Sequence, residues 1–281
     1  MAKIICNYIL ILFLFAIAGC SLAKYGINYS QTSIPRFADY SVTKNNPPED
    51  ERIKVVSYNI RFSKKIEKAV NILNQNKDLK DADIILLQEM DETGVEKIAK
   101  ELNYNYVYYP AVFHPIPKQN FGNAILSKWP ILNDSKIILS DDSDEKLQRI
   151  AASATLDING KKMMVFSVHM RISIKPFIRS IQTARIIRSI PDDIDYCIVA
   201  GDFNTFTQMG YFAVLNPFEK NGFTLATKEI GWTYKHWYTV NKKFSLDHIF
   251  SKGMKTINYG KVNNHSASDH IPIWADFSLV K

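Results

Sequence analysis

The chain has 281 residues, a length that one large α/β domain with processed ends accounts for. Its composition, with 46% hydrophobic, 12% aromatic and 22% charged residues, excludes extended disorder. The net charge of +7 favours anionic partners such as nucleic acid, phosphorylated small molecules or anionic lipid head groups, without choosing among them.

The N-terminus has the layout of an export signal. Lys3 precedes an apolar run from Ile4 to Ala18 that is shorter than the roughly 20 residues a spanning helix needs, although a membrane anchor is the alternative. The sequence Ile17-Ala-Gly-Cys20 is similar to the lipobox of bacterial lipoproteins, which implies cleavage before Cys20 and lipidation of its thiol. We therefore expect a signal peptide over residues 1–19 and an exported protein of the cell envelope, reaching the outer membrane or facing the periplasm if the cell is Gram-negative.

Beyond the signal, we expect a lipidated cysteine and polar tether over residues 20–51 and a folded domain over residues 52–281. Cys197 lies in an apolar run and is expected to be a core residue rather than a reactive thiol. The acidic cluster from Asp141 to Glu145 is expected to be a solvated loop.

Strand-like runs alternate with helical patterns along the domain. Helices are expected at residues 64–75, 95–102 and 174–190, the last with a buried face formed by Ile174, Phe177, Ile178, Ile181, Ala184 and Ile187. Strands are expected at residues 53–60, 82–87, 104–113, 123–126, 137–139, 149–158, 161–168, 196–200, 245–250 and 271–277. Short turns between several strands indicate antiparallel pairing. This pattern predicts a mixed α/β fold, a four-layer α/β/β/α sandwich of two packed, largely antiparallel sheets flanked by helices; a doubly wound sheet is the alternative.

Several apolar runs end in a polar residue of a type that binds metal or phosphate. These residues are Asn59, Glu89, His169, Asp202 and Asn204. Any one of them is explained as a turn residue or helix cap, but ligand sites gather at strand ends, so together they indicate one cleft.

Two later segments place charged residues in apolar surroundings, where an unpaired charge is costly. They are Ser245-Leu-Asp247-His-Ile-Phe250 and Ser268-Asp269-His270-Ile-Pro-Ile273. An aspartate that accepts a hydrogen bond from one imidazole nitrogen fixes the tautomer and leaves the other nitrogen for a ligand.

In chain order, these segments resemble the endonuclease/exonuclease/phosphatase superfamily of deoxyribonuclease-I-like metal-dependent phosphoesterases. The resemblance covers residues 52 to 280 and rests on Ser57-Tyr-Asn59, Leu87-Gln-Glu89, Gly122-Asn-Ala-Ile-Leu-Ser127, Val168-His169, Gly201-Asp-Phe-Asn204, Leu246-Asp247 and Ser268-Asp-His270. It implies that residues 52–281 form a catalytic domain that hydrolyses phosphoester bonds.

The resemblance also implies roles for the individual residues. Glu89 would be the principal ligand of Mg²⁺, or of Mn²⁺, with Asn59 and Asp269 near the same ion. Asp202 would orient and deprotonate the attacking water and Asn204 would hold that water or a phosphate oxygen. The two imidazoles would stabilise charge on the transition state: His169, and His270 oriented by Asp247. A purely structural role is the alternative for His169.

Substrate contacts are implied for Arg149, at a flanking phosphate, and for Asn123; a surface arginine and a turn residue are the alternatives. Arg171, Lys175 and Arg179 recur at every fourth position and suggest either an anionic groove or a solvated helix face. Many members carry an acidic residue where this chain has Arg61, which leaves the metal stoichiometry open.

We expect a monomeric phosphodiesterase with nucleic acid as its first candidate substrate. A phospholipid or inositol-phosphate phosphoesterase is the first alternative, favoured by a lipid anchor, and a catalytically silent envelope binding protein is the second.

Overall fold

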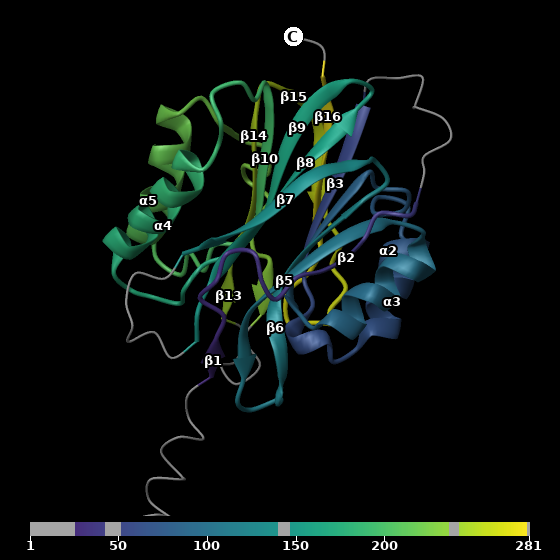
Figure 1. Cartoon of the computed structure of the whole chain (residues 1–281). Coiled ribbons are helices and arrows are strands. Elements are labelled where there is room, and N and C mark those ends of the chain that lie inside the picture. The colour runs from purple at the N-terminus through teal and green to yellow at the C-terminus, as the bar shows by residue number, and fades with distance from the viewer. Residues whose placement is uncertain (1–25, 43–51, 140–146, 236–241, 280–281) are drawn as a thin grey trace, which may run out of the picture.

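The computed structural model describes residues 26–42, 52–139, 147–235 and 242–279 (Figure 1). Two large β-sheets pack face to face, and a pair of helices covers the outer face of each (Figure 1). The predicted four-layer sandwich is therefore confirmed. The predicted signal peptide, Cys20, the end of the predicted tether and the acidic cluster all lie outside the described residues.

The first sheet has the strand order β1-β5-β6-β4-β3-β16-β15, and β2 also pairs with β5. Only β3 and β4 run parallel; every other pair in this sheet is antiparallel. Its strands are β1 Ile27–Asn28, β2 Phe37–Asp39, β3 Arg52–Asn59, β4 Ile84–Met90, β5 Asn105–His114, β6 Gln119–Ser127, β15 Lys255–Lys261 and β16 Ile273–Ser278.

The second sheet has the order β11-β14-β10-β9-β8-β7, and only β9 and β10 are parallel. Its strands are β7 Ile131–Ile138, β8 Ile150–Ile158, β9 Lys161–His169, β10 Tyr196–Asp202, β11 Thr224–Leu225 and β14 Asp247–Lys252, and a separate short pair is formed by β12 Tyr234–Lys235 and β13 Lys243–Phe244. The hairpins predicted from short turns are thus present.

Three buried clusters hold the layers together. The central cluster fills the space between the sheets, with Val55 from one and Val165 from the other. The outer clusters bury apolar faces of α2 (Ile66–Gln75) and α3 (Glu92–Leu102) on the first sheet, and of α4 (Pro176–Arg188) and α5 (Gln208–Lys220) on the second. Two of the helices begin at side-chain caps: Asp91 accepts from the N–H of Gly94 at α3, and Thr207 from that of Gly210 at α5.

The buried face predicted for residues 174–190 is wrong in half of its members. Ile174, Phe177 and Ile181 are exposed, whereas Arg179, Gln182, Thr183 and Ile186 are buried. The polar side chains face inward because remote backbone groups bind them: the Gln182 amide accepts from the N–H of Arg171 and donates to the carbonyl of Leu139. Phe177 and Ile181 are consequently left on the surface, whereas Ile178, Ala184 and Ile187 are half-buried.

The prediction of a polar tether over residues 20–51 is corrected for residues 26–42, which are part of the fold. β1 and β2 pair with β5 and lengthen the first sheet. The buried ammonium of Lys136 donates to the carbonyls of Tyr29, Ile34 and Pro110 at 3.0, 3.2 and 3.4 Å. Burial lowers the pKa of Lys136 to about 8, and these carbonyls replace the water it has lost.

A chain that begins at Arg52 should be markedly less stable than one that begins at Gly26. It loses two of three carbonyl partners of Lys136 and exposes the edge of β5, which we expect to cost about 3 kcal/mol or more. Urea unfolding of the two chains measures the difference, and size-exclusion chromatography detects edge-to-edge association. Equal unfolding midpoints for the two chains would show that residues 26–42 add no stability and act only as a tether.

Strand register brings the predicted site residues to one end of the sandwich. Asp202 is paired with His169 on one side and with Asp247 on the other, and Asn59 is paired with Gln88, the neighbour of Glu89. Gly201 makes this approach possible: its φ is +147°, and a Cβ there would lie 1.9 Å from the carbonyl oxygen of Val168.

Candidate active site

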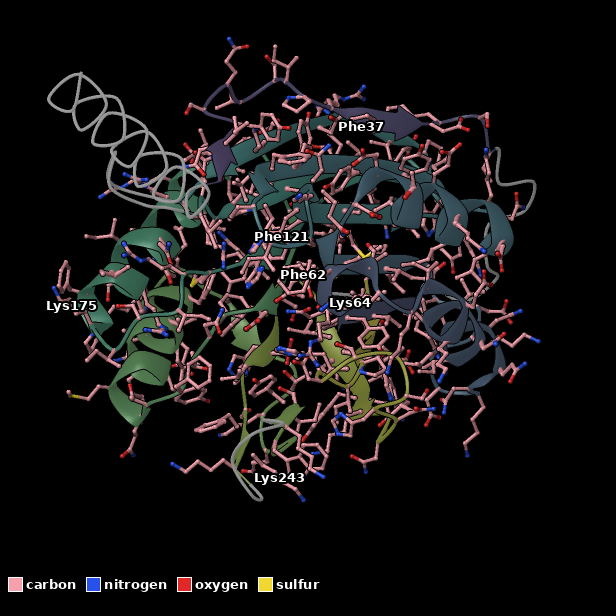
Figure 2. All side chains as sticks on the ribbon, turned by 90° about the horizontal axis from the view of Figure 1, so that it is seen from below. Phe37, Phe62, Lys64, Phe121, Lys175 and Lys243 are labelled. Carbon is pink, nitrogen blue, oxygen red and sulfur yellow. The ribbon has the colours of Figure 1, made fainter. Side chains whose placement is uncertain are left out.

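The predicted site residues meet between the two sheets, at the end where β3, β4, β9 and β10 finish and β14 begins. Figure 2 looks onto this end of the molecule, with Phe62 and Phe121 near its centre. Asn59, His169, Asp202, Asn204, Asp247 and His270 are all buried. Their burial strengthens the electrostatic interactions among them.

Glu89 is presented by an irregularity in its strand. The pairing of β4 with β6 shifts register between Leu87 and Met90, and Glu89 has φ +58°, an uncommon conformation for a residue with a side chain. Burial raises the pKa of the Glu89 carboxyl, and the nearby charge of Asp269 raises it further, against lowering by His270 and Asn59. A cation bound beside this carboxyl group would stabilise its ionised form.

Asn59 joins two carboxylates that would otherwise repel each other. Its Nδ2 donates to Oε1 of Glu89 and to Oδ2 of Asp202, both at 3.2 Å, while its Oδ1 accepts from the N–H of Arg61. The amide therefore fixes the spacing of the two acidic groups.

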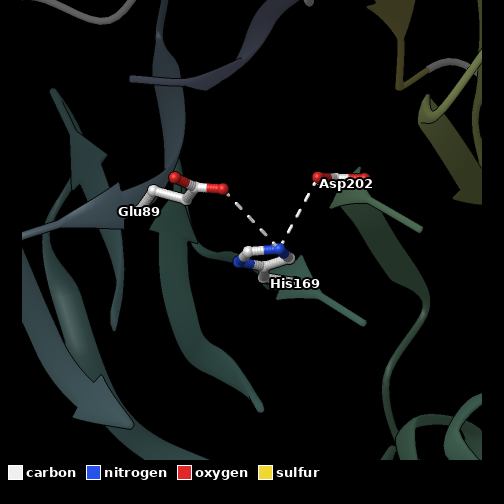
Figure 3. Close-up of side chains that lie close together, drawn as sticks. All are labelled: Glu89, His169 and Asp202. Carbon is white, nitrogen blue, oxygen red and sulfur yellow. Dashed lines mark ion pairs between the residues drawn. The ribbon is translucent and has the colours of Figure 1, made fainter. Parts of the chain in front are cut away.

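His169 completes a cluster with the same carboxylates. Its Nε2 lies 3.6 Å from Oδ2 of Asp202 and 4.0 Å from Oε1 of Glu89 (Figure 3). The three potential ligand atoms lie within 4.8 Å of one another, a spacing that suits a single metal ion. Burial lowers the pKa of His169 well below its usual value, so the ring is neutral, and its buried Nδ1 has no hydrogen-bond partner among the described residues.

Asp202 also faces a second imidazole. Nε2 of His270 lies 3.6 Å from Oδ2 of Asp202, and Nδ1 of His270 donates to Oδ2 of Asp247 at 2.8 Å. Burial opposes a charge on this ring, but Asp247 and then Asp202 outweigh burial and raise the pKa of His270 to about 10. Burial raises the pKa of Asp202 to about 7, although the His270 cation lowers it.

The predicted Asp247–His270 pair is therefore present, and it is supported by a residue that no sequence pattern indicated. Oγ1 of the buried Thr233 donates to Oδ2 of Asp247 at 2.6 Å and accepts from the N–H groups of Leu246 and Asp247. The Tyr234 ring lies 4.7 Å from that of His270, centroid to centroid. Thr233 and Tyr234, at the start of β12, have no distinctive spacing in the sequence, so only the fold reveals them.

Asn204 lies in a tight loop with Asp202. Its N–H donates to Oδ1 of Asp202, its Nδ2 donates to the carbonyl of Met170, and its φ is +52°. The loop is held from outside by Arg179, which is 1% exposed and donates to the carbonyls of Phe203, Asn204 and Ser173. The sequence had suggested either a solvated helix face or an anionic groove for Arg179. The structure places its side chain in neither.

We expect Arg179→Met to lower kcat about tenfold or more while KM changes little, because the side chain positions the Asp202–Asn204 loop without reaching the cleft. Loss of a buried, hydrogen-bonded charge should also lower the free energy of unfolding by about 2–3 kcal/mol. Steady-state kinetics below the melting temperature of the variant tests the first effect. The matched control is Arg188→Met, at an exposed position on the same helix. An unchanged kcat in the folded Arg179→Met protein would contradict a positioning role.

Asp269, the third predicted metal ligand, has a cationic neighbour. Oδ2 of Asp269 lies 3.3 Å from Nε of Arg61. Arg61 stands where many proteins of the resembled superfamily carry an acidic residue. Arg61 begins a turn in which three successive residues, Arg61, Phe62 and Ser63, have positive φ. The turn is tied down by bonds from Gln119 Nε2 to the carbonyl of Phe62 and from the N–H of Asp91 to Ser63 Oγ.

Of the two predicted substrate contacts, Arg149 lies beside the site and Asn123 is buried between the sheets. The guanidinium of Arg149 stacks on the Phe121 ring at 5.2 Å and lowers the pKa values of Glu89 and His169, so its charge is felt in the site. Asn123 is buried between the sheets, where Nδ2 donates to the carbonyls of Ile150 and Ser167 at 3.0 and 2.9 Å. Both of its amide hydrogens are used, so none is left for a substrate.

A two-sheet sandwich with acidic and imidazole groups gathered at one end of its parallel strand pairs is the arrangement of a metal-dependent phosphoesterase. The sequence profile of the Endonuclease/Exonuclease/phosphatase family matches residues 56–270, and the chain belongs to this family. Members are phosphoester hydrolases that depend on a divalent metal ion.

Solved structures share the fold. An endonuclease/exonuclease/phosphatase family protein from Leptotrichia buccalis has a TM-score of 0.65 at 19% identity, covering 80% of this chain and 99% of its own. An endonuclease/exonuclease/phosphatase from Bacteroides vulgatus has 0.66 at 18%, covering 82% and 99%. A mannosyl-6-phosphatase from Bacteroides thetaiotaomicron has 0.62 at 17%, covering 80% and 99%. At these identities the likeness shows the fold alone. A sequence comparison with curated proteins found no match.

Proposed function

We propose that this chain is a Mg²⁺-dependent phosphodiesterase that cleaves its substrate by in-line attack of water. The observation that carries the proposal is the gathering of two carboxylates and two imidazoles: Nε2 of His169 lies 3.6 Å from Asp202 and 4.0 Å from Glu89, and Nε2 of His270 lies 3.6 Å from Asp202. Acidic groups, a neutral imidazole and a cationic imidazole then face one point, which is what hydrolysis of a phosphoester requires.

The donor set fits a divalent cation. The carboxylate of Glu89 is half-buried and that of Asp202 is buried, both have raised pKa values, and the neutral ring of His169 lies beside both. Oxygen donors suit Mg²⁺, with Mn²⁺ the alternative, and Asn59 and Asp269 are the further predicted ligands. When bound, the ion neutralises charge on a phosphate oxygen.

The protein groups supply the remaining chemistry. Asp202, held by the N–H of Asn204, accepts the proton of the attacking water, and Asn204 keeps one amide hydrogen and its Oδ1 for that water or a phosphate oxygen. His270, charged at neutral pH and fixed by Asp247, donates from Nε2 to the oxygen that gains charge. His169 supports the same phosphate from the opposite sheet.

Nucleic acid is the first substrate to test, because the net charge of +7 and the arginines at the site favour a polyanion. Supercoiled DNA, sphingomyelin, phosphoinositides and mannose 6-phosphate should each be incubated with Mg²⁺ and with chelator. The expected result is Mg²⁺-dependent cleavage of a diester. No metal-dependent hydrolysis of any substrate, with Asp202→Ala leaving ligand binding unchanged, would instead support the silent binding protein.

Export is part of the proposal. We expect cleavage before Cys20 and its lipidation, which would hold a monomeric domain at the cell envelope. In the described part of the chain, no helix has the length and apolar character needed to cross a bilayer. Mass spectrometry of the mature N-terminus tests this, and Cys20→Ala should release the protein from the membrane fraction. A lipid-free N-terminus at Met1 would exclude the anchor.

A further inference from the structure

Four large apolar side chains stand out from the end of the molecule that carries the site. Ile116 is 84% exposed, Ile174 83%, Ile172 64% and Phe177 59%. Single exposed apolar residues are common on protein surfaces, but a group of them at one end marks an interaction site. We call these four residues the apolar rim.

The apolar rim flanks the candidate site on two sides. Ile116 is in the turn between β5 and β6, and this hairpin borders the site because the Phe121 ring lies 5.6 Å from that of His169. Ile172 and Ile174 lie in the segment that leaves the site directly after His169, and Phe177 is in the first turn of α4. Figure 2 shows Phe121 near the centre of this end and Lys175, beside Ile174, at its margin.

Cationic side chains alternate with the rim residues. Lys118 is exposed in the same turn as Ile116, and Lys175 is exposed between Ile174 and Phe177. Lys64, also exposed, lies over the Phe62 ring near the centre of the same end (Figure 2). Apolar tips next to lysines are the pattern of a surface that inserts into an anionic lipid interface.

The chain enters the fold on the same side. Ile27 of β1 pairs with Phe113, just before the turn that carries Ile116, and β1 lies at the lower end in Figure 1, as does the β5–β6 hairpin. Five residues separate Cys20 from Gly26, a stretch that spans at most about 20 Å. A lipid on Cys20 would therefore keep this end of the domain close to a bilayer.

We propose that the apolar rim docks on an anionic lipid bilayer, with the mouth of the site facing the head groups. Binding to nucleic acid would account for the lysines but not for the exposed isoleucines, because proteins contact nucleic acid mostly at phosphate and sugar. A protein partner would need a continuous apolar core, whereas here lysines interrupt the apolar residues. The further consequence, that head-group phosphoesters rather than nucleic acid are the substrate class, rests on the phosphoesterase activity proposed above, but docking itself does not.

Vesicle flotation tests docking with the piece from Gly26 to Lys281. It contains every described strand and helix, and the related structures fold over 99% of their own length while matching 80–82% of this chain. With vesicles of equal parts phosphatidylcholine and phosphatidylglycerol and with chelator present, the wild type should float. Ile174→Glu and Phe177→Glu should each bind about tenfold more weakly. The matched control is Ile257→Glu on β15, a position that is 45% exposed and lies in the edge strand of the first sheet.

A second measurement locates the inserted residue. Cys197 is buried and is the only cysteine in the piece, so Ile174→Cys can be labelled selectively with an environment-sensitive fluorophore. Vesicles should shift its emission to the blue, and lipids bearing a quencher in their acyl chains should quench it. The same label at Ile257→Cys should show neither effect.

The outcomes separate docking from catalysis. Asp202→Asn should float like the wild type, and hydrolysis can fail in every assay while flotation and quenching still hold. Absence of flotation, equal loss in Ile257→Glu, or no quenching at position 174 would overturn docking. So would Ile174→Glu and Lys175→Glu weakening binding to a DNA duplex but not to vesicles, which would make this end a nucleic-acid interface.

Discussion

Asp202→Asn is expected to lower kcat/KM for a phosphodiester by about 10³-fold or more, because the amide cannot accept the proton of the attacking water. The substitution keeps the shape of the side chain and the acceptor for the N–H of Asn204. Hydrolysis of bis(p-nitrophenyl) phosphate with Mg²⁺ measures the effect. Asp193→Asn, at an exposed position before β10, is the matched control. A loss of less than tenfold would exclude Asp202 as the base.

The same substitution should stabilise the metal-free protein. Burial raises the pKa of Asp202 from 3.8 to about 7, so the folded state holds its proton more tightly than the unfolded state. The carboxyl is neutral in both states below pH 3.8, and its ionisation costs stability increasingly as the pH rises to about 7. Asp202→Asn should therefore raise the unfolding free energy at pH 8 by about 1–3 kcal/mol and at pH 4 by much less. Equal effects at both pH values would contradict this cause.

The convergence of the site could be predicted from the sequence because it depends on strand ends. Asn59, Glu89, His169 and Asp202 each follow an apolar run, and parallel pairing of β3 with β4 and of β9 with β10 places those ends together. Alternating short strands and helices likewise predicted the layers. These are local patterns that the fold preserves.

What the sequence could not reveal depends on partners distant along the chain. Arg179 is buried because the carbonyls of Phe203 and Asn204 bind it, and no helical periodicity records that. Residues 26–42 look like a polar tether because β1 and β2 are short and gain their order from the edge of β5. Hydrophobic patterns predict which face an element would bury only where apolar contacts decide it.

The set of metal ligands is a similar case, because the resemblance names residues but not distances. It pointed to Asn59, Glu89 and Asp269, and the structure adds a cluster in which potential ligand atoms of Glu89, His169 and Asp202 lie within 4.8 Å of one another. Arg61 already lies against Asp269 and offsets its charge. The contribution of Asp269 to cation binding should therefore be smaller than that of Glu89.

Glu89→Gln is expected to weaken Mg²⁺ binding at least about tenfold and to remove most of the thermal stabilisation that Mg²⁺ gives the wild type, whereas Asp269→Asn should have a much smaller effect. Isothermal titration and melting curves with and without Mg²⁺ measure both. Because burial raises the pKa of Glu89, protons compete with the cation, and the affinity of the wild type should fall as the pH is lowered. If Asp269→Asn costs more affinity than Glu89→Gln, the ion lies on the Arg61 side of the cleft and the cluster around His169 binds the phosphate alone.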